Sequence, residues 1–250
     1  MITDPQGTVL ALFVAFCRIG GCVMVMPGFA SARVPPFIRL LAALAVSMAI
    51  LPLLWDTIYP RVSAAGTGYI VLVITETFIG TMFGLIARLY TLGLQFAGSA
   101  IAMMIGFTAP GSSDIIEDAP ENQLNNLLTF AGLMLLFALD FHHVIFTALV
   151  DSYTAIPIGD IVSPQKALIT LTDTLVATFY IMLRLASPFI LFGLMFNISI
   201  GMINKLAPQI PIYFISTPYL LMGGLFMLYL SIAVLVQQFA EAFTTIYVGR

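Results

Sequence analysis

Long apolar stretches, broken only by single charges or short polar loops, constrain this chain more than any other feature. The candidate stretches are residues 8–26, 38–54, 69–87, 89–105, 124–150, 167–186, 188–203 and 212–240. A helix needs about 20 apolar residues to cross a bilayer. Lipid offers the backbone no hydrogen-bond partner, so these stretches must be helical, and the alternation typical of barrel strands is absent. The sequence therefore predicts an all-α, polytopic membrane protein.

Composition supports this interpretation and excludes some partners. Hydrophobic residues make up 60% of the 250 residues and charged residues only 8%, against about 25% charged in soluble domains. A soluble fold could not hide that much apolar surface. The net charge is -3 and no basic block occurs, so we expect no nucleic-acid partner. We interpret residues 1–250 as one membrane domain. Residues 1–7 hold an acid and no base, so we expect no cleavable signal peptide.

The number of helices is open between six and eight. Residues 69–105 form either two helices or one long hairpin divided around Arg88. Pro188 divides residues 167–203, because proline removes a backbone donor and is expected to kink or break the helix there. Basic residues are spread over almost every loop, so the positive-inside rule does not give an orientation.

Ionisable residues inside the apolar stretches are costly and therefore candidates for function. They are Arg18, Glu76, Arg88, Asp140, His142, His143, Asp173, Arg184 and Glu241. Two interpretations stay open. The groups line a polar path for an ion or substrate, or they form buried pairs that hold neighbouring helices together.

The motifs of enzymes and metal sites are missing. Neither a Gly-x-Ser-x-Gly elbow nor a phosphate-binding glycine loop occurs, and no cysteine lies near a histidine. His142 and His143 are adjacent, and adjacent side chains on a helix point about 100° apart, whereas paired helical ligands stand three or four residues apart. We expect the cluster around Asp140 to be a polar group at the membrane interface. The sequence predicts no enzyme and no cofactor.

Small residues mark candidate packing faces. Gly80 and Gly84 follow Glu76 at a spacing of four, and Gly93 and Gly98 come in the next stretch. This spacing lets another helix approach backbone to backbone. The face serves either general membrane packing or the assembly of other subunits.

A candidate gate lies where one apolar stretch meets an acidic loop. Met103, Met104 and Phe107 lead into residues 106–122, which hold four acids and no base. The residues of interest in this loop are Pro110, Gly111, Ser112, Ser113, Asp114, Glu117 and Asp118. Methionine re-packs easily against irregular surfaces. One interpretation is a collar beside a movable loop, and the other is core packing beside a surface loop.

Several blocks, in order along the chain, resemble one family. They are Arg18-Ile19-Gly20-Gly21, Pro27-Gly28-Phe29, Val34-Pro35, the Glu76/Gly80/Gly84 spacing, Gln95-Phe96-Ala97-Gly98, Asn126-Leu127-Leu128, His142-His143, residues 152–159, and Asn204-Lys205-Leu206-Ala207-Pro208-Gln209. Together they resemble the FliR family of flagellar and injectisome export proteins. The loop holding Asn204, Lys205, Pro208 and Gln209 is the most specific block.

The resemblance implies a role without chemistry. FliR-like proteins assemble with FliP-like and FliQ-like subunits into a conical helical export gate in the inner membrane, at the core of the basal body. An FlhB-like switch protein lies near the entrance, and unfolded flagellar proteins pass through. In such proteins the segment matching residues 106–122 belongs to a plug inside the pore. The alternative is an independent secondary transporter that uses Glu76, Arg88 and Arg184 around a midplane site.

Overall fold

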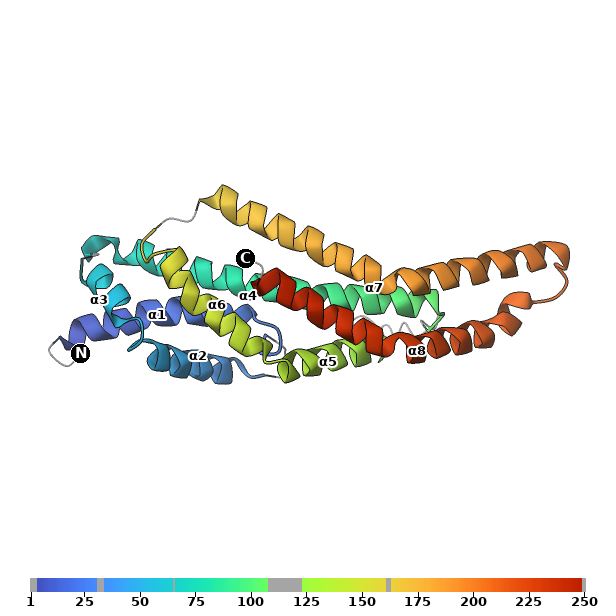
Figure 1. Cartoon of the computed structure of the whole chain (residues 1–250), viewed down its shortest axis with the longest axis horizontal. Coiled ribbons are helices and arrows are strands. Elements are labelled where there is room, and N and C mark those ends of the chain that lie inside the picture. Colours follow the sequence, from blue (N-terminus) through green and yellow to red (C-terminus); the bar gives the residue numbers. More distant parts are fainter. Residues whose placement is uncertain (1–3, 31–33, 65, 108–122, 161–162, 249–250) are drawn as a thin grey trace. The chain divides into compact units, whose positions relative to one another are not determined.

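The computed structural model describes residues 4–30, 34–64, 66–107, 123–160 and 163–248, and these ranges are helical with no strand (Figure 1). This confirms the all-α prediction. The elements are α1 (Pro5–Val25), α2 (Pro36–Ile50), α3 (Trp55–Ala64), the short 3-10 turn η1 (Gly66–Gly68), α4 (Tyr69–Met104), α5 (Gln123–Ala138), α6 (Phe141–Ala155), α7 (Pro164–Leu206) and α8 (Ile212–Val248).

Within the described ranges, four helices are long and apolar enough to cross a membrane. They are α1, α4, α7 and the Ile212–Phe239 part of α8. The pair α2 and α3 is bent by 103° at a short break, and α5 and α6 form a second broken pair. Counting each broken pair as one span gives up to six. The chain is therefore a helical membrane protein.

Three expected boundaries differ from the structure. The helix α4 runs without interruption through Arg88, whose side chain is exposed, so residues 69–105 are not two segments. The helix α7 likewise continues through Pro188. Conversely, the segment expected to be continuous over residues 124–150 is interrupted, because α5 ends at Ala138 and α6 begins at Phe141.

A serine explains how α7 continues through its proline. Pro188 has no N–H to donate to the carbonyl of Arg184, four residues earlier. The hydroxyl of Ser187 donates to that carbonyl instead, at 3.0 Å. Neighbouring hydroxyls commonly satisfy such carbonyls in membrane helices. Of the two outcomes expected at Pro188, a kink or a break, α7 does not show the break, and the freed carbonyl has a local partner.

The chain divides into two compact units. Unit 1 comprises residues 1–90 and 140–175, and unit 2 comprises residues 91–139 and 176–249. In unit 1, α1 packs against both α2 and α3. The core there is formed by Ala11, Val14, Ala15, Leu51, Leu54, Ile58, Val62, Leu72, Tyr153 and Ile158. The helix α1 is central to unit 1, since it packs against α2 and α3 and has buried residues from Gly7 to Val23.

The start of α1 is a polar cap. The carboxylate of Asp4 accepts the backbone N–H of Gly7 at 3.1 Å and the hydroxyl of Tyr59, on α3, at 3.0 Å. These bonds favour the charged form, with the Gly7 bond the larger effect, so the pKa of the Asp4 carboxyl lies below its usual value. Asp4 therefore ties the first turn of α1 to α3.

In unit 2, the end of α4 packs between parts of α7 and α8. Ile101, Ala102, Ile105, Ala186 and Phe189 form its buried cluster. The helix α4 ends at Met104. Gly106, two residues later, has a left-handed φ of 73°. The N–H of Gly106 donates to the carbonyl of Met103 at 3.3 Å, and that of Phe107 to Ala102 at 2.9 Å. This is the bond pattern of a Schellman cap, which a glycine makes without steric cost.

Candidate functional site

Arg18 lies at the centre of a buried polar network in unit 1. Its Nε donates to Oε2 of Glu76 at 2.6 Å, and its Nη2 donates to Oε1 at 3.1 Å. Both side chains are 0% exposed. This two-point arrangement matches the fork of the guanidinium to the carboxylate, the strongest geometry for such a pair. The pair joins α1 to α4 across 58 residues of sequence.

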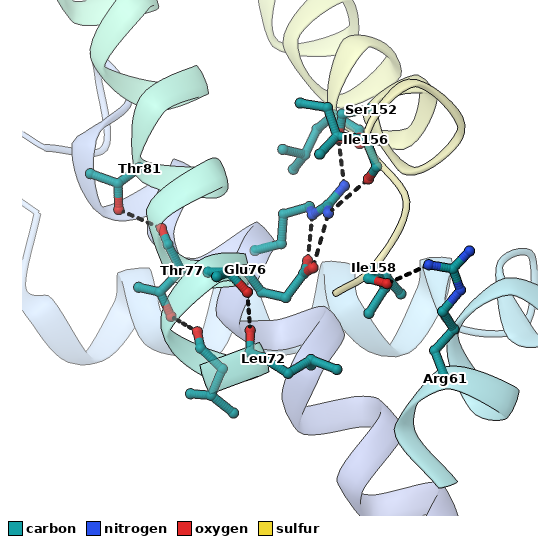
Figure 2. A network of polar contacts seen from close by, with 12 residues as sticks. Arg61, Leu72, Glu76, Thr77, Thr81, Ser152, Ile156 and Ile158 are labelled. Atoms are coloured by element: carbon teal, nitrogen blue, oxygen red, sulfur yellow. Dashed lines mark hydrogen bonds and ion pairs between the residues drawn. The ribbon is translucent and has the colours of Figure 1, made fainter. Parts of the chain in front are cut away.

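The helix α6 and the residue that caps its end, Ile156, supply the remaining partners of the arginine. Nη1 donates to Oγ of Ser152 at 3.0 Å, and Nη2 also donates to the carbonyl of Ile156 at 3.2 Å. The Arg18 Cζ atom lies 4.0 Å from the ring centroid of Tyr153, within the range of a cation–π contact. Figure 2 shows Glu76, Ser152 and Ile156 converging on this point. One guanidinium therefore connects three helices.

Glycines let α1 and α4 approach closely enough for this pairing. A Cβ atom on Gly80 would overlap the backbone carbonyl of Arg18, and one on Gly84 would lie 2.5 Å from the carbonyl oxygen of Cys22. Across the contact, a Cβ on Gly21 would lie 2.7 Å from the carbonyl oxygen of Thr77. The spacing of Gly80 and Gly84 indicates close helix approach, but the helix that approaches is α1 of the same chain.

The turn after α6 is held by a second arginine. The Nη1 atom of Arg61, on α3, donates to the carbonyl of Ile158 at 2.6 Å (Figure 2). The Ile158 side chain is buried in the unit 1 core. Gly159 follows with a left-handed φ of 88°. Arg18 and Arg61 thus bind carbonyls two residues apart, on either side of Pro157.

The network is closed rather than poised for chemistry. Both oxygens of Glu76 accept from Arg18, which donates four hydrogen bonds in all to described residues. Neither side chain is accessible to solvent. For Arg18 and Glu76, the interpretation as a buried pair that holds helices together is confirmed. The network is a structural brace, because every nitrogen of the guanidinium donates to an acceptor and both carboxylate oxygens of Glu76 accept.

Residues 9–246 match the family described as bacterial export proteins, family 1. The chain belongs to the FliR family. A flagellar biosynthetic protein FliR from Caulobacter vibrioides is 33% identical over 218 residues, covering 87% of this chain and 86% of the relative. The protein of that name from Buchnera aphidicola is 25% identical over 225 residues, covering 89% and 86%. The flagellar biosynthetic protein FliR from Escherichia coli is 25% identical over 208 residues, covering 83% of this chain and 78% of the relative.

The remaining glycines expected at a packing face are buried within this FliR-family chain. A Cβ on Gly93 would overlap the Cγ2 atom of Thr178, on α7, so α4 and α7 are in close contact there. Gly98 is also buried in α4. Both glycines belong to unit 2, and the contact of Gly93 is again inside the chain.

The residues of the expected gate collar differ in their surroundings. Met103 is 64% exposed. Met104 is half-buried, and a Cβ on Gly193 of α7 would lie 3.0 Å from its Cβ atom. Phe107 packs against the buried cluster of unit 2. The three side chains therefore do not form one exposed ring within unit 2. The loop residues from Pro110 to Asp118 lie outside the described residues.

The family-motif loop joins α7 to α8 in unit 2. Asn204 and Lys205 lie in the last turn of α7, while Pro208 and Gln209 lie in the connection. Lys205, Pro208 and Gln209 are exposed. A cation in the last turn of a helix interacts favourably with its dipole.

The other ionisable residues are not among the hydrogen-bond partners of Arg18 and Glu76. Arg88, Asp173 and Arg184 are exposed on their helices. Glu241 accepts a hydrogen bond from Gln237 at 3.1 Å, one turn earlier on α8. A transporter site built on Glu76 would need its carboxylate open to a substrate, and the structure instead shows it engaged by Arg18.

Asp140, His142 and His143 come closer together than their sequence positions suggest. Their candidate ligand atoms all lie within 4.8 Å of one another. The sequence argument placed them inside one helix, but Asp140 precedes α6 and has a left-handed backbone with φ of 55°.

Sequence reasoning did not assign roles to the partners of Arg18 on α6. Ser152, Tyr153 and Ile156 lie in the block 152–159, which was noted only as a family resemblance. The available signal was a serine next to an aromatic residue on an apolar helix. That signal is weak, because most such pairs contribute only to packing.

Proposed function

We propose that this chain is a subunit of the flagellar type III protein-export gate in the bacterial inner membrane. In this proposal it assembles with FliP-like and FliQ-like subunits, near an FlhB-like switch protein at the basal body. The observation that carries the proposal is the family match over residues 9–246, together with relatives named flagellar biosynthetic protein FliR. The matched range includes every residue of the Arg18 brace.

The exposed surface of α8 supports an assembly. Its apolar span Ile212–Phe239 has 28 residues, and its most apolar window is only 6% buried within the chain. At 1.5 Å per residue this span is about 42 Å long, against about 30 Å of hydrocarbon. It would need a tilt of about 45° to stay in lipid, which exceeds the usual range of 0–40°. Contact with another subunit would cover the part of the span that exceeds the hydrocarbon.

The proposed mechanism is passive. The chain performs no catalysis, and other components of the machine supply the energy. The brace holds α1, α4 and α6 in place while unfolded flagellar proteins pass through the assembled channel. In this proposal the exposed Met103 borders the passage, Met104 and Phe107 pack within unit 2, and the loop from Pro110 to Asp118 acts as the plug. The engagement of Glu76 by Arg18 argues against the alternative of an independent secondary transporter.

Co-expression tests the assembly directly. The tagged chain would be produced with FliP-like and FliQ-like subunits from the same bacterium, and native mass would be measured in mild detergent. We expect a defined hetero-oligomer that contains all three proteins. The controls are the chain alone and each pair with one subunit left out. A monomer or simple homodimer in the presence of both partners would exclude the gate proposal.

A further inference from the structure

The start of α6 gathers three metal-ligating side chains in unit 1. The Oδ1 atom of Asp140 lies 4.0 Å from Nε2 of His142. The rings of His142 and His143 are 4.6 Å apart between centroids. One ligand atom from each of the three residues lies within 4.8 Å of the other two. The group takes no part in the Arg18 brace.

The local backbone produces this proximity. Asp140 caps α6 with a left-handed conformation, φ 55° and ψ 31°. Its carbonyl accepts the N–H of His143 at 2.9 Å and that of Val144 at 3.3 Å. Phe141, only 1% exposed, anchors the start of the helix in the protein interior. Asp140 therefore lies outside the regular helix, where its carboxylate reaches His142. His142 and His143 are adjacent within α6, but their ring centroids lie only 4.6 Å apart.

The donor set suits a particular class of cation. Two imidazoles and one carboxylate are ligands of Zn²⁺ and of other divalent first-row metals, whereas Ca²⁺ and Mg²⁺ prefer oxygen alone. Metal–ligand bonds of about 2.0–2.2 Å place tetrahedral donors about 3.3 Å apart. The donors must therefore close by up to about 1.5 Å. Asp140 and His142 have 75% and 31% of their side chains exposed, so rotation of the side chains achieves this.

We propose that Asp140, His142 and His143 bind a divalent first-row transition metal such as Zn²⁺ at the start of α6. The three protein ligands leave a coordination position on the exposed side for water. The carboxylate offsets the unfavourable effect of the positive helix N-terminus on a cation. Binding would hold the Asp140 side chain against the first turn of α6.

Cobalt absorption tests this site in the full-length chain. The metal-free protein, purified in mild detergent without a histidine tag, would be titrated with Co²⁺, and Zn²⁺ would then be added. We expect one Co²⁺ per chain, visible absorption bands of low-symmetry coordination, and displacement by Zn²⁺. Zn²⁺ should also raise the thermal midpoint of the wild-type protein, because it binds only the folded site.

Variants separate this site from other metal binding. His142→Gln, His143→Gln and Asp140→Asn are each expected to weaken Co²⁺ binding at least about tenfold. Asp151→Asn, an exposed acid elsewhere on α6, is the control and should bind as the wild type does. Asparagine also tolerates the left-handed conformation, so Asp140→Asn keeps the test valid if a histidine variant fails to fold. Absence of Co²⁺ binding, or equal binding by Asp140→Asn and the wild type, would overturn the proposal.

Discussion

At the scale of single residues, the buried charge of Arg18 is the most informative feature. A charge inside a membrane helix is costly unless it is paired and hydrogen-bonded. Arg18 meets both conditions, through Glu76 and the acceptors on α6. Such a pair contributes more to the specificity of the arrangement than to its stability, since an apolar pair of similar size often packs equally well. The brace thus selects which helices come together.

Removing one partner of the brace should be more harmful than removing both. We expect Arg18→Ala to lower the free energy of unfolding by about 3–5 kcal/mol, because Glu76 would stay buried without its cation. The double variant with Arg18→Met and Glu76→Met should recover much of that loss. Thermal unfolding in mild detergent would measure the difference. A double variant less stable than Arg18→Ala would contradict this account.

Gly80 should not tolerate a side chain. Gly80→Ala places a methyl group on the carbonyl of Arg18, so α1 and α4 must separate and the brace must weaken. The control is Gly201→Ala in α7, where a Cβ meets nothing within 4 Å. There alanine should stabilise the helix by up to about 1 kcal/mol. Comparison of the two midpoints checks the prediction, and equal midpoints would show that the α1–α4 contact is not as close as described.

At the scale of elements, the continuity of α7 depends on a local hydrogen bond. The carbonyl of Arg184 loses its helical donor at Pro188, and the hydroxyl of Ser187 replaces it. The helix α7 continues through this proline over 43 residues. A break at the proline would instead have produced the two shorter helices that the sequence indicates.

Replacing Ser187 should weaken α7 selectively. Ser187→Ala leaves the carbonyl of Arg184 without its donor, at an expected cost of about 1 kcal/mol. Ser199→Ala is the control, because the Ser199 hydroxyl also donates to a backbone carbonyl of the preceding turn, that of Met195, but no proline follows it. Hydrogen exchange around residue 184 would measure the effect. Equal exchange in the two variants would show that the serine does not substitute for the missing donor.

At the scale of the whole molecule, the main feature is the large apolar surface that the long helices leave exposed. The most apolar window of α7 is 22% buried and that of α8 only 6%, whereas that of α1 is 44% buried. Unit 1 therefore covers much of its own helix α1, whereas the apolar surfaces of α7 and α8 must be covered by lipid or by other subunits. This division matches a subunit of a larger membrane assembly.

Deleting the acidic loop tests the plug at this scale. If residues 110–118 block the channel, their removal should make cells leak ions, because nothing would then fill the lumen between export events. Sodium or proton flux into cells that express the variant would measure the leak. Cells that express the wild-type chain at the same level are the control. Normal export in cells that stay tight to ions would exclude the plug assignment.

The sequence by itself determined the helical class and the membrane setting. The length of the apolar stretches and their low content of charged residues decide which structures are stable in lipid. The sequence also indicated the family, through blocks such as Asn204-Lys205 and the spacing of Gly80 and Gly84. Only the tertiary structure decided that Arg18 meets Glu76 and Ser152, that Gly80 faces α1, and that Asp140 turns back toward His142. Apolar patterning assigns each helix a lipid-compatible length but does not specify which helix lies beside it. Those choices depend on where backbones approach closely enough for buried charges to find their partners.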